Sequence, residues 1–540
     1  MSPSRAVKRT NGPRMGRLAS AALLLSASFV LSRLLGVIRM SVIADVFGNS
    51  PTVNAYFAAF RIPDTMFTLV SGGALASAFI PVFAGLVEKR DERQAWAVAS
   101  SVLNSIALAL AAMAALAFVF APQIMGFLVN GHAHGPCNGF TTAQVGLTVS
   151  LTRIMLLQPI FLGLAAIVTS VLQTYHRFAL TAIAPLLYNL SVIGGALAGK
   201  AAGIEALAWA VVLGAAAQLL IQLPGLIPEA RRFLLELNWG LPASREVLRL
   251  FIPRVIGLGA FQAMLFITLY LAARLPCGMV GAINYSWLLI SFPVGALGTA
   301  AATAIFPTLS RLTAAEDLRA VAQTVNRSLR LVLFLAIPAA AGLIVLRRPI
   351  VNLLYFRGEW TAADTEQTAF ALLFYALALA PLTAIEVLPR VFYAMRDTIS
   401  PVRIALVAVT VDAVLSVVLV HWLPRASGQG GLALATAIAS AAQAIWLAIA
   451  LNGRLRGLGF DSLRRAIADA TIASLVMALV LYDALDPLTA IFAQHGVGAF
   501  FTVAVEIVLG GATFAAVAYL RASPELWQVR GMFLGRYERL

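Results

Sequence analysis

LASAALLLSASFVLSRLLGVIRMSVIADV, residues 18–46, is an apolar run with two arginines, Arg33 and Arg39, in its second half. The run is long enough to cross the roughly 30 Å hydrocarbon core of a bilayer as a helix. A guanidinium keeps its charge, and placing it at bilayer depth is costly unless a cavity, a partner or an anion receives it. This stretch therefore predicts a membrane-spanning helix whose cations face a cavity for something negatively charged.

Similar apolar runs recur along the whole chain. Its 540 residues are 60% hydrophobic and 12% charged, with a mean hydropathy of +0.88, which no soluble core requires. The runs do not alternate as the strands of a membrane barrel would. We expect an all-α polytopic membrane protein with about fourteen transmembrane helices. These are predicted near 18–40, 53–86, 95–120, 143–171, 179–199, 205–226, 248–272, 279–309, 329–346, 366–392, 402–423, 431–452, 467–488 and 498–520.

The positive charge of the chain indicates its orientation. The formal net charge is +15, and the basic residues cluster at alternate ends of the predicted spans. Cytoplasmic loops carry such an excess of Lys and Arg, so the basic segments 1–17 and 521–540 are both predicted to be cytoplasmic. The first apolar run is long and is followed by many others, so we interpret it as a retained helix and not a signal peptide. A nucleic-acid partner is not expected.

Three pairs of segments recur at nearly the same offset. Residues 76–81 match 302–307, 226 positions further on, while 175–185 resemble 393–401 and 206–210 resemble 433–437. The offset covers six spans, an even number, so both copies have the same orientation, a known plan of transporters. We predict two parallel six-helix lobes around a central cavity, a linker between them and an appended helix pair. The lobes are residues 18–226 and 248–452, the cytoplasmic linker is 227–247, and the helix pair lies in 453–520.

The charges inside the predicted spans are the candidate binding residues. Arg33 and Arg39 are six residues apart, so their directions differ by roughly 120° around the helix, and both fit the wall of a broad cavity. Arg61, in the second span, is a third candidate. The alternatives are that Arg33 and Arg39 extend to the membrane surface, and that Arg61 forms a local ion pair with Asp64.

A second group of charges and a set of helix-bending residues are also candidates. Glu386, Arg390, Arg396 and Asp397 are predicted at a cytoplasmic helix end, as a polar network between helices or as an entry site for a charged head group. Helix bends favour prolines and glycine pairs. The candidate hinges are Pro63, Gly72, Gly73 and Pro293.

The remaining motifs exclude several functions. Cys137 and Cys277 are both predicted in exoplasmic loops, where a disulfide is permitted but not established by the sequence. His132, His134 and Cys137 lie in a turn-like segment, and no metal site or cofactor is predicted. The sequence contains no phosphate-binding loop, no H-E-x-x-H and no G-x-S-x-G, so an enzyme is not expected. Work would come from an ion gradient, the membrane potential or consumption of the cargo.

Several collinear motifs between about residues 20 and 460 resemble one family. They include Ser32-Arg33-Leu34-Leu35-Gly36-Val37-Ile38-Arg39, Asn54-Ala55-Tyr56-Phe57-Ala58-Ala59-Phe60-Arg61-Ile62-Pro63, Ala184-Pro185-Leu186-Leu187-Tyr188-Asn189 and Arg390-Val391-Phe392-Tyr393-Ala394. They resemble the MurJ/MviN family of lipid II flippases, in the multidrug/oligosaccharidyl-lipid/polysaccharide exporter superfamily.

The resemblance implies fourteen helices, two six-helix lobes, a central cationic cavity, and a lateral groove formed partly by the last two helices. It implies a bacterial inner-membrane protein that moves undecaprenyl-diphosphate-linked peptidoglycan precursor, lipid II, to the periplasmic leaflet by alternating access. Arg33 and Arg39 fall on the family's cavity arginines, which are thought to meet the diphosphate, and Arg61 falls on a basic position. A monomer surrounded by membrane lipids is expected.

The sequence also departs from the family pattern. Neutral residues replace expected charges in the first, second and eighth spans: Met40, Asn54, Phe67, Thr68, Gly72, Trp287, Leu288 and Ser291. Two alternatives therefore stay open. One is transport of another lipid-linked glycan or an amphipathic metabolite by a flippase or antiporter. The other is a non-transporting paralogue that scaffolds cell-wall synthesis proteins.

Overall fold

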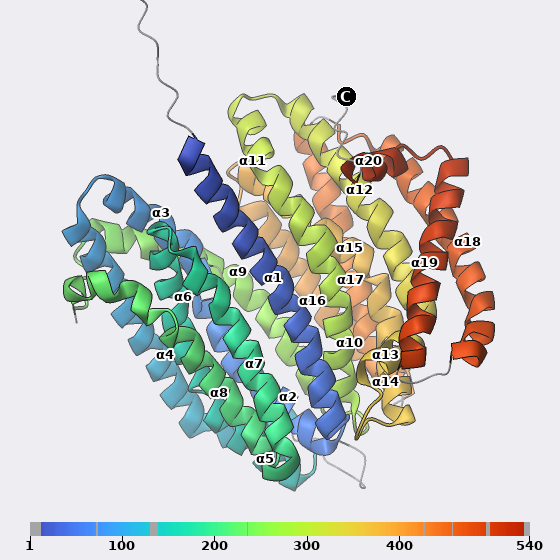
Figure 1. Cartoon of the computed structure of the whole chain (residues 1–540), viewed down its shortest axis with the longest axis horizontal. Coiled ribbons are helices and arrows are strands. Elements are labelled where there is room, and N and C mark those ends of the chain that lie inside the picture. Colours follow the sequence, from blue (N-terminus) through green and yellow to red (C-terminus); the bar gives the residue numbers. More distant parts are fainter. Residues whose placement is uncertain are drawn as a thin grey trace, which may run out of the picture. The chain divides into compact units, whose positions relative to one another are not determined.

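The computed structural model describes residues 12–71, 74–129, 139–234, 236–424, 427–455, 457–492 and 497–533. Every regular element in these ranges is a helix, as Figure 1 shows. Helices satisfy all backbone hydrogen bonds within one segment, which hydrocarbon surroundings require. The predicted all-α membrane fold is confirmed. The predictions for Gly72, Gly73, His132, His134 and Cys137 concern residues outside the described ranges.

Twenty α-helices and two shorter helical segments of other types follow one another along the described chain. The first group is α1 (Gly12–Phe47), α2 (Pro51–Ser71), α3 (Ala74–Glu88), α4 (Glu92–Val129), α5 (Thr142–Met155), α6 (Gln158–Thr174), α7 (Phe178–Ala202), α8 (Ile204–Leu220), the 3-10 helix η1 (Leu223–Arg232) and α9 (Pro242–Ala272). The second is α10 (Met279–Pro293), the π-helix η2 (Val294–Thr299), α11 (Ala300–Ala314), α12 (Leu318–Val345), α13 (Arg347–Tyr355), α14 (Ala362–Leu377) and α15 (Leu379–Ala394). The last is α16 (Ile399–Trp422), α17 (Gly428–Leu455), α18 (Phe460–Phe492), α19 (Val497–Leu520) and α20 (Pro524–Phe533).

Fewer helices than the fourteen predicted membrane spans meet a test of length and apolar composition among the described residues. Among the described residues, eleven helices are long and apolar enough to cross a membrane. The count is twelve if α14 and α15, bent by 45° relative to each other, form one span. Within the predicted spans 53–86 and 248–272, the apolar helices found among the described residues are the shorter Ala78–Glu88 and Phe261–Ala272. The count of fourteen is therefore not confirmed.

The chain forms two compact units, each defined by the contacts within it. Unit 1 contains Met1–Ile43, Ala59–Pro122 and Val149–Ile256, and unit 2 contains Ala44–Ala58, Gln123–Thr148 and Gly257–Leu540. The turn between α1 and α2 and the segment between α4 and α5 thus belong to unit 2, although their helices continue into unit 1. The lobe boundaries 18–226 and 248–452 remain predictions.

In unit 1, small residues allow α7 and α8 to pack closely. A Cβ added at Gly195 would lie 2.0 Å from the Cβ of Ala210, so only glycine fits at this crossing. The linker segment after η1 is held against α4. Ser100 and Ser101 accept hydrogen bonds from the backbone N–H groups of Leu234 and Asn238, both at 3.0 Å. The predicted linker therefore includes an ordered segment attached to unit 1.

In unit 2, α12 packs against α15 and α18, which gives two apolar cores. One core contains Val325, Leu329, Val391, Phe392 and Leu447, among others. The second lies between α12, α18 and α19 and includes Phe334, Met477 and Phe514. Glu525 of α20 accepts a hydrogen bond from the Arg330 Nε of α12 at 2.6 Å, which fixes α20 to this core.

Two helix ends in unit 1 and two in unit 2 share one backbone geometry. Arg90 and Glu316 have φ of 61° and 57°, and they are 226 positions apart, as are the matched segments 76–81 and 302–307. In each case the next N–H bonds to a carbonyl five residues earlier, Asp91 to Leu86 and Asp317 to Leu312, both at 3.1 Å. His176 and Arg396 have the same left-handed conformation. These are Schellman-type caps without the usual glycine.

Candidate functional site

Arg33 and Arg39 lie on α1, on the part that belongs to unit 1, and both are half-buried. The guanidinium carbon of Arg33 lies 4.8 Å from the ring centroid of Phe29, one turn earlier on the same helix. That of Arg39 lies 6.0 Å from the ring centroid of Tyr188 on α7. An aromatic face attracts a cation and leaves its N–H groups able to bind oxygen. Both arginines are thus oriented by aromatic rings.

Polar contacts between α1 and α7 position these arginines. Ser28 donates a hydrogen bond to the carbonyl of Ala182, and the Nδ2 of Asn189 donates to the Oγ of Ser32 at 3.3 Å. The Nε2 of Gln158 donates to the Tyr188 hydroxyl at 3.2 Å, which fixes the ring under Arg39. Serine and asparagine are suited to such contacts between membrane helices.

Arg61 belongs to the same unit and to the same electrostatic group. The carboxylate of Asp64 interacts with Arg61 and, more weakly, with Arg39, and it also influences Tyr188. The helix α2 continues past Pro63, and two residues later the Thr65 hydroxyl donates to the carbonyl of Arg61 at 2.8 Å. The structure therefore brings Arg39, Arg61, Asp64 and Tyr188 within electrostatic range of one another. The local Arg61–Asp64 ion pair stays an alternative to ligand contact by Arg61.

The four residues of the second predicted cluster separate into different surroundings. Glu386 and Arg390 stay together, 3.9 Å apart between carboxylate and guanidinium. Glu386 accepts from the Thr299 hydroxyl at 3.1 Å, and Arg390 donates to the Thr303 hydroxyl at 2.8 Å. This contact group joins α15 to the π-helix η2, which begins directly after the hinge candidate Pro293. A π-helical turn inside a long helix is frequent at functional sites.

Asp397 instead pairs with Arg454, at the end of α17. It also accepts from the backbone N–H groups of Ile399 and Ser400, both at 3.0 Å, and so caps the start of α16. Burial alone would raise the pKa of Asp397, but the hydrogen bonds from Ser400 and the contact with Arg454 together lower this pKa to about 2. Arg396 is exposed in its left-handed cap and contributes no contact to either group.

Residues 45–54, which we call the α1–α2 corner, form a polar contact network within unit 2. The Oδ1 of Asn54 accepts from the N–H of Gly281 at 2.6 Å, and the Nδ2 of Asn49 donates to the carbonyl of Gly278 at 2.8 Å. Gly281 lies in the first turn of α10, where backbone N–H groups lack helical partners. Asn54, 2% exposed, therefore caps α10 from another helix.

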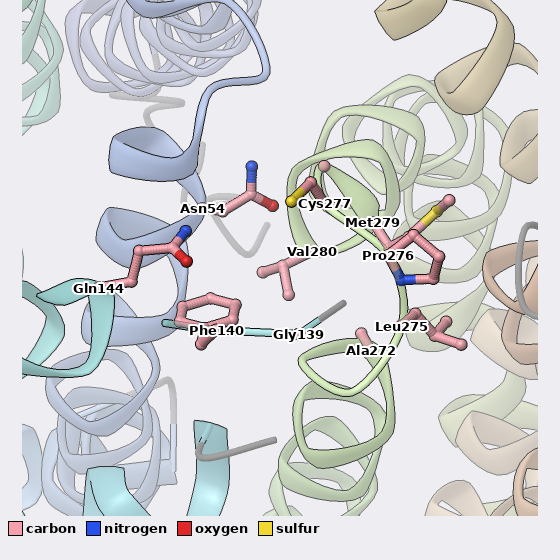
Figure 2. A pocket seen from close by; sticks show the side chains of 11 residues that line it. Asn54, Gly139, Phe140, Gln144, Ala272, Leu275, Pro276, Cys277, Met279 and Val280 are labelled. Atoms are coloured by element: carbon pink, nitrogen blue, oxygen red, sulfur yellow. The ribbon is translucent and has the colours of Figure 1, made fainter. Parts of the chain in front are cut away.

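More contacts hold this corner in place. Gln367 of α14 accepts from Asn49 at 3.2 Å and donates to the carbonyl of Cys277 at 3.3 Å. The hydroxyl of Tyr285 donates to the carbonyl of Gly48 at 3.0 Å. Figure 2 shows a small pocket beside the network, with Asn54, Phe140 and Gln144 on one side and the turn of residues 272–280 on the other.

Two acids that are buried within long apolar helices, Asp412 and Glu506, were not identified from the sequence. Asp412 on α16 is 2% exposed and accepts from the hydroxyls of Ser416 and Thr436, at 3.2 and 3.3 Å. Glu506 on α19 is fully buried. Each could have been recognised in the sequence as a single charged residue inside an apolar run, which is the pattern that identified Arg33. Among the described residues, no cluster of three or more His, Cys, Asp or Glu side chains suits a metal ion.

The neutral residues at three of the expected charged positions have defined roles in the structure. Asn54 caps α10. The ring of Trp287 packs edge-on against Tyr375 with centroids 5.3 Å apart, and the hydroxyl of Ser291 donates to the Trp287 carbonyl at 2.7 Å. Aromatic packing of this kind stabilises a helix interface without any charge.

Comparison with known proteins gives a consistent result. A sequence model of the family described as lipid II flippase MurJ matches residues 43–505. The lipid II flippase MurJ of Burkholderia cenocepacia is 31% identical over 444 residues, 81% of this chain and 84% of that protein. The probable lipid II flippase MurJ of Vibrio cholerae is 31% identical over 436 residues, 78% of this chain and 81% of that protein.

Solved structures show the same fold. A structure of lipid II flippase MurJ in an inward closed conformation superposes with a TM-score of 0.75 at 22% identity, covering 95% of this chain and all of that chain. An inward-facing multidrug resistance transporter of the MATE family, in the MOP superfamily, gives a TM-score of 0.65 at 14% identity, covering 81% of this chain and 99% of that chain. Given the match over residues 43–505, the chain belongs to the MurJ family.

Proposed function

We propose that this protein is a lipid II flippase, which moves an undecaprenyl-diphosphate-linked saccharide from the cytoplasmic to the periplasmic leaflet of the bacterial inner membrane. The observation that carries this proposal is family membership over residues 43–505. The proposed orientation has both termini in the cytoplasm, in agreement with the basic clusters at alternate span ends.

Arg33, Arg39 and Arg61 are the proposed diphosphate-binding residues. A guanidinium presents parallel N–H donors that match the oxygens of a diphosphate, and such charge-assisted bonds are strong in a partly dry cavity. Phe29 and Tyr188 support two of these guanidiniums from their faces, at 4.8 and 6.0 Å.

The α1–α2 corner is the proposed gate on the exoplasmic side. Its contacts are neutral hydrogen bonds, such as Asn54 with Gly281 at 2.6 Å, which each contribute only about 1 kcal/mol net. Alternating access requires a closed state that is stable but reversible. A network of a few neutral bonds meets that requirement, and an ion gradient or the membrane potential would drive the cycle.

The experiment that tests the proposal is complementation of cells depleted of their own lipid II flippase. We expect wild type to support growth, and Arg33→Ala or Arg39→Ala to abolish it at unchanged membrane abundance. Arg357→Ala is the matched control, because Arg357 is exposed and its side chain donates to the carbonyl of Leu353 in the preceding helix α13, at 2.9 Å. Full growth with both cavity variants would contradict the diphosphate role.

A different cargo is the second candidate function. The neutral residues Asn54, Trp287 and Ser291, at positions where the family resemblance implies charge, favour it. The discriminating measurement is binding of lipid II compared with the same lipid lacking the diphosphate. A flippase for lipid II should lose most affinity without the diphosphate, and Arg39→Ala should remove the difference. A failure of wild type to complement at all would favour the non-transporting scaffold.

A further inference from the structure

Glu506 is the one charged residue of α19, in the middle of VGAFFTVAVEIVLGGATFAAVAYL, residues 497–520. It lies about 12 Å along the helix axis from Gly498, where the apolar span begins. This depth falls inside the hydrocarbon region of a bilayer. Neither the proposed diphosphate site nor the α1–α2 corner uses it.

The side chain of Glu506 is buried without a partner. It is 0% exposed, and neither carboxylate oxygen has a hydrogen-bond partner among the described residues. The helix α19 packs mainly against α18 and also contacts α13, α12 and α20. The nearest hydroxyl along its own helix, Thr502, already donates to the carbonyl of Gly498 at 3.1 Å.

The charged groups of the elements around α19 are engaged elsewhere or exposed. Asp469 of α18 pairs with Arg521, Arg348 of α13 pairs with Glu366, and Arg330 of α12 pairs with Glu525 of α20. Arg347 of α13 donates to the carbonyl of Ile344 at 2.6 Å. The buried hydroxyl of Tyr355 donates to the carbonyl of Tyr285 at 3.3 Å. The other titratable residues of these helices are exposed, namely Asp461, Arg464, Arg465, Tyr482, Asp483, Asp486, Arg319, Arg327, Tyr519 and Arg530.

An ionised carboxylate in this place would have neither a counter-ion nor a donor from the residues that the structure describes. Such a charge is far more costly than the neutral acid, so the group takes up a proton and does not stay ionised. A metal ion is a poorer match, because Ca²⁺ or Mg²⁺ needs several oxygen ligands and Glu506 supplies only its own two. The described residues contain no metal-like cluster.

We propose that Glu506 is a proton-binding site of the C-terminal helix pair, occupied while α19 is packed against α18 and α13, and emptied when α19 separates from them. On separation the carboxyl O–H bond breaks, the proton passes to water that enters between the helices, and the carboxylate keeps the electron pair. Its use as the coupling site that powers cargo movement rests on the proposed flippase function, whereas proton binding itself does not.

The first test is infrared difference spectroscopy of the purified full-length protein in lipid vesicles, recorded between acidic and basic pH. We expect a buried protonated-carboxyl band that disappears at high pH in wild type. Glu506→Gln keeps the shape of the side chain and should lose this band at every pH. Asp483→Asn, which changes an exposed acid on α18, should keep it. Asp412 is also buried and can give a band of its own, so the outcome that would overturn the proposal is a Glu506→Gln difference spectrum identical to that of wild type.

Hydrogen exchange of the wild-type protein keeps the proposal testable even if Glu506→Gln does not fold. If deprotonation accompanies separation, the opening equilibrium of α19 rises about tenfold per pH unit once intrinsic exchange is corrected for. The amides of α7, which contains no acidic residue, should show no such rise. Equal pH dependence in α19 and α7 would contradict the proposal.

The two proposals fail separately. If the band and the exchange behave as expected but wild type does not complement flippase-depleted cells, the proton site stands and the flippase function falls. If complementation succeeds while the band is absent, the flippase stands and the Glu506 inference falls.

Discussion

Asp397 accepts an ion-pair contact from Arg454 while capping the first turn of α16 through the N–H groups of Ile399 and Ser400. A similar ion pair in unit 1 has the basic residue at the helix end and the acid as its partner. The guanidinium of Arg177, the residue after His176, donates two hydrogen bonds to the Glu229 carboxylate, at 2.8 and 2.9 Å. Arg177 and Asp397 each directly follow a residue in the left-handed conformation, His176 and Arg396, so they occupy equivalent positions at two helix ends. The two ion pairs therefore have their charges reversed: the residue at the helix end is basic in unit 1 and acidic in unit 2. Only the acidic residue, Asp397, also caps the following helix.

Asp397→Asn should remove the ion pair and keep the cap, since asparagine is also a favourable capping residue. We expect a small loss of thermal stability at neutral pH. The pKa of Asp397 is lowered to about 2, below its unfolded value near 3.9, so its stabilisation is present above about pH 4 and is lost as the pH falls toward 2. The difference between wild type and Asp397→Asn should shrink over that interval.

The charge-reversed double variant Asp397→Arg with Arg454→Asp serves as the control. Because arginine cannot accept from the N–H groups of Ile399 and Ser400, reversal should not restore stability. Full restoration would show that the ion pair alone matters and that the cap contributes nothing measurable.

Asn54→Ala should weaken the α1–α2 corner. The substitution leaves the buried N–H of Gly281 without its acceptor, which costs about 1–3 kcal/mol. Thr52→Ala is the matched control on the same segment, because Thr52 is exposed and its hydroxyl bonds to that of Ser50, so this variant should be close to wild type. Thermal unfolding of the purified protein measures both effects. Equal destabilisation by the two substitutions would contradict the capping role.

Gly281→Ala should disturb the same corner by steric conflict. A Cβ at this position would lie 1.9 Å from the Oδ1 of Asn49, so either Asn49 or the first turn of α10 must move. Gly126→Ala is the matched control, because its added Cβ meets nothing within 4 Å. In a helix interior alanine is favoured over glycine by about 0.5–1 kcal/mol, so this control should be neutral or slightly stabilising. If Gly281→Ala unfolds at the same temperature as wild type, the close approach of Asn49 to Gly281 is contradicted.

Tyr188 should act through the orientation of Arg39. Tyr188→Phe keeps the aromatic face 6.0 Å from the guanidinium and loses only the hydroxyl that accepts from Gln158. Tyr188→Leu removes the face, worth about 0.5–2 kcal/mol for a cation. In flippase-depleted cells we expect near-normal growth with phenylalanine and impaired growth with leucine. Identical growth at equal abundance would show that Arg39 needs no aromatic support.

The candidate site was predictable in part. Arg33, Arg39 and Arg61 were identified as charged residues inside apolar runs. Placing a charge inside a membrane-spanning helix costs free energy whichever helices surround it. The same criterion applied to carboxylates would have identified Asp412 and Glu506. Sequence proximity alone grouped Arg396 and Asp397 with Glu386 and Arg390, but a helix end separates them, and the chain direction changes at the left-handed Arg396.

Asn54 shows the limit of reasoning from one sequence. Its amide replaces an expected acid and resembles a lost charge, yet in the structure it caps a helix 227 positions away in the chain. No local pattern encodes that contact, because it depends on where α2 meets the start of α10.

Composition and apolar length determined that this chain forms membrane helices, since hydrocarbon cannot satisfy open backbone groups and long apolar segments avoid water. Motifs along the chain indicated its family. Only the tertiary structure decided which polar groups meet, such as Asn54 with Gly281, and which find no partner within the described part of the chain, such as Glu506. Those pairings depend on the crossing and depth of helices distant in sequence, and a side chain's neighbours in space are not its neighbours along the chain.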